Sequence, residues 1–320
     1  MEANIKTEMK DDTESTNHLP AILKGILYSN IFALIAFAAA YTITNWNSDV
    51  GGLLSFSEFV LVPLGMGVIA MRFWIQLKKR PVALLPLTIL NTILAISLSA
   101  LFMGEGVICL VIVSPLILGF MFSGVILGKY LYQHNNTTLK ANTFVIFMSL
   151  FVYDTFSEHN YTNIVSDEIT IHASREDVWK YVAAHPVNTS EPDYWLFKIG
   201  LPKPIQSTVT ADTIGSQRQC VFSNGAIFDE VVVQNETDSL FTFDIVRQPE
   251  DPEIIGHIQI KRGQFILKEN IDGTTTLVGI SWYTLKVYPV WYYDLWAEDI
   301  TRNVHLRVMN HIKALAESDV

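Results

Sequence analysis

The sequence has little cysteine and little charge. Only two of its 320 residues are cysteines, Cys109 and Cys220, and neither belongs to a CxxC pair or to a spacing typical of zinc ligands. The pattern excludes a disulfide framework and a structural zinc centre. Charged residues make up 17% of the chain, whereas about a quarter is usual in soluble domains. A wholly soluble globular protein is therefore disfavoured.

Catalytic motifs are also missing. The chain has no glycine-rich phosphate loop, no GxSxG nucleophile motif and no kinase signature. Its histidines are scattered, with no HxxxH pair and no carboxylate at ligand spacing. We therefore predict no metal site and no cofactor. We expect the histidines to have structural or surface roles, with His311 as a minor candidate for contact with a ligand.

Charge is distributed unevenly between the two halves. Residues 1–156 carry nine Lys or Arg and nine Asp or Glu, whereas residues 157–320 carry 13 and 23, which accounts for the whole net charge of −10. Hydrophobic residues make up 50% of the chain, and the mean hydropathy is +0.28. The acidic second half argues against a nucleic-acid partner, because binding phosphates needs a basic face. The uncharged-on-balance first half is suited to a membrane, and the acidic second half is suited to water.

Long apolar runs occupy the first half. A bilayer core of about 30 Å requires about 20 apolar residues in a helix. We predict an all-α transmembrane region of four to five helices over residues 19–156, preceded by a disordered polar tail at residues 1–18. The predicted spans are residues 26–44, 59–77, 82–103 and 107–128, with a shorter fifth at 142–156.

The loops between these spans predict the orientation. Basic residues lie after the second and fourth spans, and the opposite loops hold only acidic residues: Lys78, Lys79, Arg80, Lys129 and Lys140 against Asp49, Glu58 and Glu105. The positive-inside rule then places the N-terminus in the cytoplasm. If the fifth span crosses the membrane, the second half is extracytoplasmic. If it only lies in the interface, that half is cytoplasmic.

The second half changes to short alternating segments separated by turn residues, which predict an antiparallel sheet. A long amphipathic helix ends it, with a stripe from Tyr292 through Trp296 to Ile312 that we expect to face the sheet. The class is α+β: a curved sheet around a long C-terminal helix, with an apolar cavity between them. Strands are predicted at 167–172, 208–213, 217–222, 227–234, 240–247, 263–269 and 274–287, and helices at 176–182 and 291–317.

Four segments in this half carry a family resemblance: EITIHASREDVWKYV at 168–182, YWLFKIGLPKPI at 194–205, GSQRQCVFSNGAIFDEVVV at 215–233 and WYYDLWAEDITRNVHLRVMNHIKALAE at 291–317. Residues 160–317 resemble the START-like, or polyketide cyclase/dehydrase-like (SRPBCC), helix-grip superfamily. The whole chain is similar to bacterial membrane proteins in which such a domain follows several spans. The resemblance implies a helix-grip fold, a hydrophobic ligand and a bacterial plasma membrane. It implies no reaction.

Strand alternation selects the residues that we expect at a ligand site. Arg218 shares a strand face with Phe222, and Glu230 shares one with Phe228. Both charges would point into the concave face and could pair, which should lower the pKa of Glu230. We expect the pair to anchor a polar head group. The apolar body of the ligand would contact Phe222, Phe243 and Trp296, with Phe228, Tyr283 and His311 as further cavity candidates.

Three functions remain open from the sequence. The first is a membrane-tethered module that binds a hydrophobic small molecule or lipid. The second is a cyclase-, hydratase- or hydrolase-like enzyme, in which Glu230 and Tyr283 act as acid and base. The third is an interaction scaffold with no ligand. Against the ligand site stands a simpler interpretation, in which Arg218 and Glu230 form only a structural ion pair at the sheet edge.

Overall fold

The computed structural model describes residues 18–46, 56–103, 106–134, 137–155, 157, 160–251, 253–254 and 257–318. Two compact units can be distinguished. One comprises Met1–Ser48, Ser57–Ser99 and Ser114–Asp154, and the other Asp49–Phe56, Ala100–Val113 and Thr155–Val320. The predicted tail, apart from His18, lies outside the described residues, as do Asp49 and Glu105.

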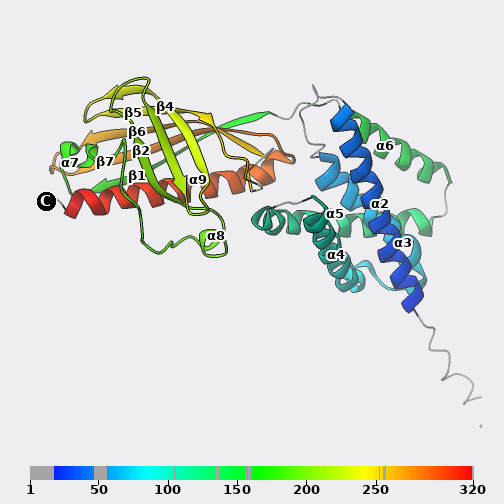
Figure 1. Ribbon diagram of the computed structural model, residues 1–320. Helices are drawn as coiled ribbons and strands as arrows, with labels where there is room; N and C mark the ends of the chain where they lie inside the picture. The colour runs from blue at the N-terminus through cyan, green and yellow to red at the C-terminus, as the bar shows by residue number, and fades with distance from the viewer. Residues whose placement is uncertain are drawn as a thin grey trace, which may run out of the picture. The chain divides into compact units, whose positions relative to one another are not determined.

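The first unit is helical (Figure 1). Four stretches are long and apolar enough to cross a membrane, as predicted from the apolar runs: Leu19–Ala39, Ser57–Leu77, Pro81–Leu101 and Val107–Gln133. The fifth predicted span is also a helix, but it is not one of these four, and its crossing stays a prediction. The elements are α2 (Leu19–Trp46), η1 (Ser57–Leu61), α3 (Val62–Trp74), η2 (Ile75–Leu77), η3 (Pro81–Leu84), α4 (Leu85–Met103), α5 (Val107–Gln133) and α6 (Thr137–Thr155).

Close backbone packing and polar contacts hold these helices together. A Cβ atom on Gly67 of α3 would lie 2.0 Å from the carbonyl oxygen of Met121 on α5, so only glycine fits at this crossing. Asn30 of α2 donates to Asn91 of α4 over 2.7 Å, and Asn91 donates in turn to Ser29 over 3.0 Å. Small residues and interhelical hydrogen bonds of this kind stabilise helix pairs in an apolar solvent.

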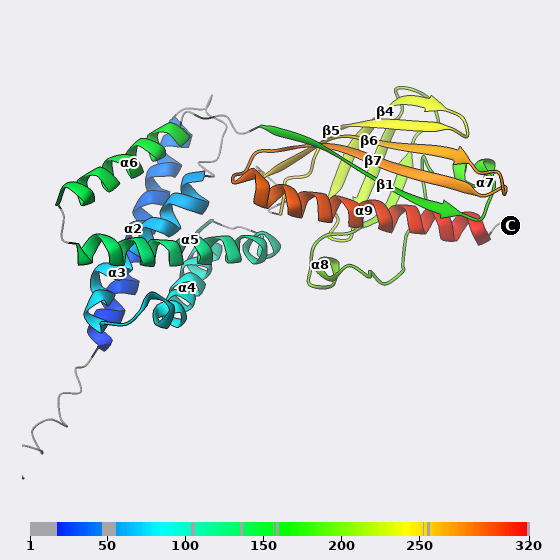
Figure 2. The same ribbon diagram turned by 180° about the vertical axis from the view of Figure 1, so that it is seen from behind.

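The second unit is a seven-stranded antiparallel sheet around one long helix (Figures 1 and 2). The strand order is β1-β7-β6-β5-β4-β3-β2, and α9 (Val290–Ser318) contacts β1, β7 and β2. Because β1 and β2 are the two edge strands, the sheet must curve around α9. This confirms the predicted curved antiparallel sheet around a long C-terminal helix, whereas the apolar cavity between them stays a prediction. The strands are β1 (Tyr161–Ile171), β2 (Pro204–Val209), β3 (Gln217–Phe222), β4 (Ile227–Glu236), β5 (Leu240–Arg247), β6 (Ile258–Glu269) and β7 (Thr275–Leu285), with α7 (Arg175–Trp179) and α8 (Trp195–Lys198) between β1 and β2.

Three strand predictions need correction, because β1, β2 and β6 all begin earlier than expected; β6 begins at Ile258 and not at residue 263. The strand predicted at 208–213 is β2, which begins four residues earlier at Pro204 and ends at Val209. Proline is tolerated there because β2 is an edge strand and Pro204 is its first residue. The first strand also starts earlier than expected, at Tyr161, and its whole length pairs with β7.

The long helix is rotated from the predicted orientation. The expected stripe includes Trp296 and Val304, but these side chains pack against a cluster that contains Leu196 and Phe197 of α8. The positions one residue further along face the sheet instead: Ala297 packs with Val165 and Tyr283, and Met309 belongs to the core with Phe265 and Leu277. Of the predicted stripe, Ile312 does lie in that core. Because α9 is covered on two sides, its most apolar stripe is not the one that faces the sheet.

Candidate functional site

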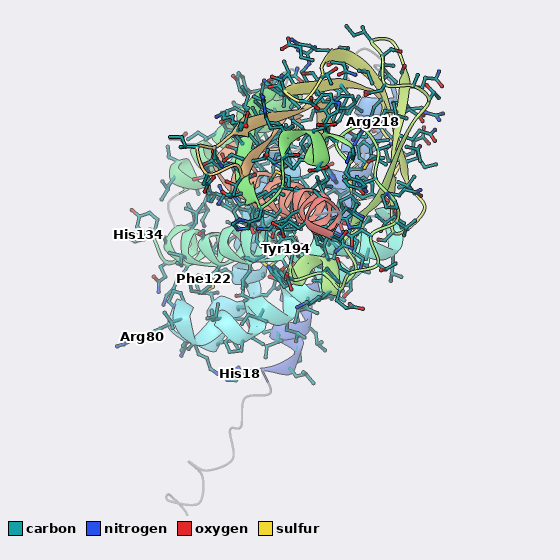
Figure 3. The ribbon with its side chains drawn as sticks, turned by 90° about the vertical axis from the view of Figure 1, so that its left-hand side faces the viewer. His18, Arg80, Phe122, His134, Tyr194 and Arg218 are labelled. Carbon is teal, nitrogen blue, oxygen red and sulfur yellow. The ribbon has the colours of Figure 1, made fainter. Side chains whose placement is uncertain are left out.

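Strands β3 and β4 place two charges on the concave face of the sheet. Arg218 lies directly opposite Glu230 in the antiparallel register, and the two side chains form an ion pair. Both are buried, with 3% and 4% of their surface exposed. The neighbouring residue Asp229 points the other way and pairs with exposed Arg247 over 2.5 Å. Arg218 is labelled among the strands in Figure 3.

Aromatic rings and a backbone carbonyl complete the surroundings of Arg218. Its Nε donates to the carbonyl oxygen of Ala183 over 2.8 Å. The guanidinium carbon lies 4.3 Å from the ring centroid of Phe243 and 6.0 Å from that of Phe241. The attraction between a cation and an aromatic face is strongest when water is excluded. The structure therefore brings together Arg218, Glu230 and Phe243 of the predicted set.

Burial reverses the expected direction of the Glu230 pKa shift. Desolvation raises the pKa of Glu230 above its ordinary value, and the attraction of Arg218 opposes this effect only in part. The prediction of a lowered pKa was wrong, because burial outweighs the pairing with Arg218 and strand alternation does not reveal how deeply the carboxylate is buried. On the same face, burial and the charge of Glu230 raise the pKa of Cys220 to about 12, so its thiol is a poor nucleophile.

His185, which no sequence pattern singles out, lies in this region. His185 is 5% exposed, and its Nε2 is buried without a hydrogen-bond partner, while its Nδ1 lies 3.2 Å from the carbonyl oxygen of Pro186. Burial lowers the pKa of His185 to about 4, and the charge of Arg218 contributes. The ring is therefore neutral, with Nδ1–H donating to Pro186 and Nε2 left as an acceptor. His311 contacts this ring at 5.2 Å between centroids and also bonds the Pro186 carbonyl.

The other predicted residues lie in separate places. Phe222 and Phe228 contact each other at 5.0 Å between centroids, next to the charge pair on β3 and β4. Tyr283 is buried on β7 and donates to Asp294 of α9 over 2.7 Å. Burial and this bond raise the pKa of Tyr283 above its ordinary range. Trp296 stacks edge-on with Trp195 beside α8, so the structure does not place it with Arg218.

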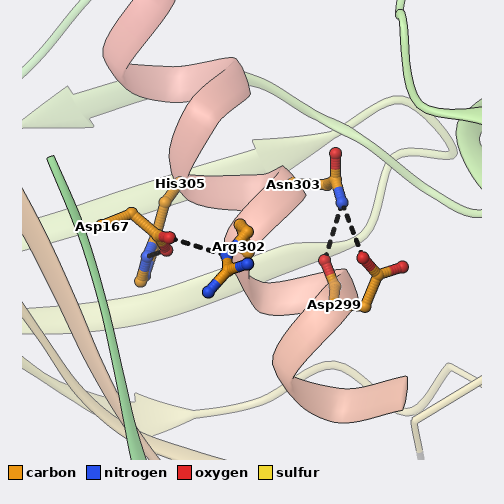
Figure 4. A network of polar contacts seen from close by, with 5 residues as sticks. All are labelled: Asp167, Asp299, Arg302, Asn303 and His305. Carbon is orange, nitrogen blue, oxygen red and sulfur yellow. Dashed lines mark hydrogen bonds and ion pairs between the residues drawn. The ribbon is translucent and has the colours of Figure 1, made fainter. Parts of the chain in front are cut away.

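A second polar group joins β7, α9 and β1. Ser281 Oγ lies 2.8 Å from His305 Nε2, and His305 Nδ1 lies 2.9 Å from Asp167 Oδ2. Arg302 donates to the other oxygen of Asp167 over 2.9 Å (Figure 4). Burial lowers the pKa of His305, although Asp167 opposes the shift. A serine, a neutral imidazole and a carboxylate in this order can transfer a proton from the hydroxyl to the ring.

Gly279 lies beside this group. A Cβ atom there would make an ordinary contact of 3.6 Å with His305 Cγ, and it would lie 3.1 Å from Met309 Sδ, which would have to move by a few tenths of an ångström. The spacing of Asp167, Ser281 and His305 in the chain carries no motif. Only strand alternation could have given a signal, because Asp167 shares a strand face with Ile169 and Ile171, and Ser281 shares one with Leu277 and Tyr283.

Among the residues that the structure describes, no group of three or more His, Cys, Asp or Glu side chains could hold a metal ion.

Comparison with known proteins identifies no family for this chain. No family model matches the sequence, and no curated protein matches it. Solved structures similar to the sheet and its helix include a protein from Nitrosospira multiformis, with 16% identity over 49% of this chain and 100% of its own and a TM-score of 0.34. Another is truncated norcoclaurine synthase from Thalictrum flavum, with 12% identity over 50% and 96% and a TM-score of 0.35. At these values the similarity concerns the fold alone.

Proposed function

We propose that the chain is a membrane-embedded protein whose C-terminal unit binds an apolar molecule with a polar head group. The observation that carries this proposal is the buried pair of Arg218 and Glu230 on the concave face. A buried ion pair adds little net stability, because the desolvation of two charges offsets their attraction. Its position among aromatic rings therefore favours a role in recognition.

Arg218 and His185 define the polar groups that the head group of the ligand needs. Arg218 carries five N–H donors, and an oxygen of the ligand would accept from them. The unpartnered Nε2 of His185 is an acceptor, and a hydroxyl of the ligand would donate to it. Phe241 and Phe243 would contact the apolar body. A hydrophobic compound or lipid with a hydroxyl and a second oxygen at one end satisfies both groups.

The helical unit supplies the membrane attachment. Its four apolar helices are long enough to span a bilayer. The described basic residues of this unit lie at one end of the helices, which by the positive-inside rule faces the cytoplasm of a bacterial plasma membrane. Crossing of α6 would place the C-terminal unit on the opposite side. Attachment would keep the binding unit where apolar ligands are concentrated.

Native mass spectrometry of the full chain in detergent tests the binding proposal. We expect a discrete additional mass on the parent protein, reduced at least tenfold in Arg218→Met and in His185→Phe. Arg247→Met is the matched control, because it removes an exposed arginine from the opposite face. Equal retention by Arg218→Met and Arg247→Met would contradict the site. A clean mass for the parent would favour the scaffold function.

The group Ser281–His305–Asp167 favours a second function, hydrolysis of an ester. Ser281 Oγ would attack the carbonyl carbon as His305 Nε2 takes its proton, and His305 would return that proton to the leaving alcohol. Water would then release the acid from Ser281. A fluorophosphonate reagent, which phosphonylates activated serines and releases fluoride, tests this. Labelling of Ser281 that is absent in His305→Gln supports an enzyme, and an unlabelled Ser281 rules this mechanism out.

A further inference from the structure

Basic residues gather at one end of the helical unit. Of its described residues, seven are basic and two are acidic: Lys24, Arg72, Lys78, Lys79, Arg80, Lys129 and Lys140 against Glu58 and Asp154. The acidic pair lies at the opposite end, where the backbone N–H of Ser57 donates to Asp154 over 2.7 Å. Figure 3 labels His18, at the start of α2, and Arg80, between η2 and η3, at the basic end.

This end also contains a cavity of about 330 Å³ between α2 and α3. Its walls combine two cations, one amide and three apolar residues: Pro20, Ala21, Lys24, Arg72, Phe73 and Gln76. Close packing keeps the cavity walls in place. Trp74 Nε1 donates to the carbonyl oxygen of Ile22 over 3.3 Å, and a Cβ atom on Gly25 would clash with that indole.

The orientation of one of the two cavity cations, Arg72, is restricted by an aromatic ring. The Arg72 guanidinium carbon lies 5.7 Å from the ring centroid of Tyr132 on α5, and the Lys140 ammonium lies 5.6 Å from the same ring. Phe73 is stacked on Tyr28 at 5.1 Å between centroids, which forms an apolar wall next to the charges. Arg72 and Lys24 both line the cavity, and the ring of Phe73 lines it as well, so its wall combines cationic and aromatic groups.

The geometry points to a binding site for the phosphate head group of an anionic phospholipid in the cavity between α2 and α3. Arg72 and Lys24 donate to the phosphate oxygens, and Gln76 supplies amide hydrogens to head-group oxygens. The acyl chains run along the apolar surface beside Tyr28 and Phe73. The helices end at this level of the bilayer, where lipid phosphates lie.

Lipid retention by the full chain in detergent tests this site. Native mass spectrometry would count phosphatidylglycerol and phosphatidylcholine retained from an equimolar mixture. We expect a preference for phosphatidylglycerol that falls roughly 25-fold in Lys24→Gln/Arg72→Gln, because one cation near an anionic head group contributes about fivefold. Lys79→Gln/Arg80→Gln is the control, because it removes the same charge from the adjacent loop, and it should keep the preference.

A second variant distinguishes lipid binding in the cavity from attraction of the lipid by surface charge in general. Ala21→Phe keeps both cations but fills the cavity, and it should lose phosphatidylglycerol as the double variant does. The charge-preserving Lys24→Arg/Arg72→Lys should retain it, and thermal unfolding in the same detergent identifies any variant that fails to fold. Equal losses in the cavity variants and the loop control would overturn the site. Displacement of the lipid by inorganic phosphate at equal concentration would overturn it too, in favour of free phosphate.

This inference rests on the membrane embedding proposed above, but the two can fail separately. A chain that sodium carbonate extracts from membranes would refute the embedding itself. A chain that stays in the membrane and retains no anionic lipid would refute only the head-group site.

Discussion

Removal of one member of the Arg218–Glu230 pair should destabilise the C-terminal unit far more than removal of both. Glu230→Leu leaves the Arg218 guanidinium buried at 3% exposure, and arginine cannot lose its proton. Breaking a buried pair in this way typically costs about 3–5 kcal/mol. Replacement of both partners by apolar residues is often neutral or stabilising by about 1–4 kcal/mol. We therefore expect Arg218→Met/Glu230→Leu to be more stable than either single variant by about 3 kcal/mol.

The two single variants should also differ in their pH dependence. Arg218→Met leaves Glu230 buried, and the loss of Arg218 removes the attraction that lowers the already raised pKa of Glu230. A carboxyl with a raised folded-state pKa stabilises the fold at low pH, and this stabilisation is lost as the pH rises through that pKa. The cost of Arg218→Met should therefore shrink on acidification from neutral pH. The cost of Glu230→Leu should not, because Arg218 stays charged.

Hydrogen exchange of the full chain, measured by mass spectrometry, resolves these effects at β3, β4 and β5. The exposed pair of Asp229 and Arg247 provides the control, since surface pairs contribute about 0.2–1 kcal/mol. Single variants that cost no more than Arg247→Met would refute the buried-pair reasoning. A double variant whose cost equals the sum of the two singles would refute it as well. A stable double variant that has lost its bound molecule would separate recognition from stability.

Three further changes test the packing. Gly263→Ala would place a Cβ atom 2.4 Å from the ring of Phe243, so we expect a loss of about 1–3 kcal/mol, measured by hydrogen exchange at β5 and β6. Gly67→Val should separate α3 from α5 and lower the unfolding temperature in detergent, where an unchanged temperature would contradict the close approach. Burial lowers the pKa of His185 from 6.5 to about 4, so the contribution of the neutral ring to stability is lost as the pH falls through this interval. His185→Gln should remove that part of the acid sensitivity. Melting curves at pH 7 and pH 4.5 would measure the difference.

Local pattern was enough to predict the strands around the charge pair. Strands β3 and β5 begin and end at the predicted residues, and β3 and β4 are joined by a short turn in which Gly225 has a φ of 85°. A short turn fixes the register of a hairpin, and alternation then fixes the face of each side chain. These two rules suffice to place Arg218 opposite Glu230. The depth of burial depends on the rest of the sheet, which is why the direction of the Glu230 pKa shift was missed.

The orientation of α9 shows where such rules fail. A hydrophobic stripe predicts that a helix is buried on one side, but it cannot distinguish two partners that cover adjacent sides. Here the loop around α8 covers Trp296 and Val304, so the side toward the sheet can include His305, a polar residue. His305 is acceptable there only because Ser281 and Asp167, both far from it in the sequence, satisfy its two ring nitrogens. A buried polar group is predictable only together with its partners, and those partners come from strands whose placement depends on the same helix.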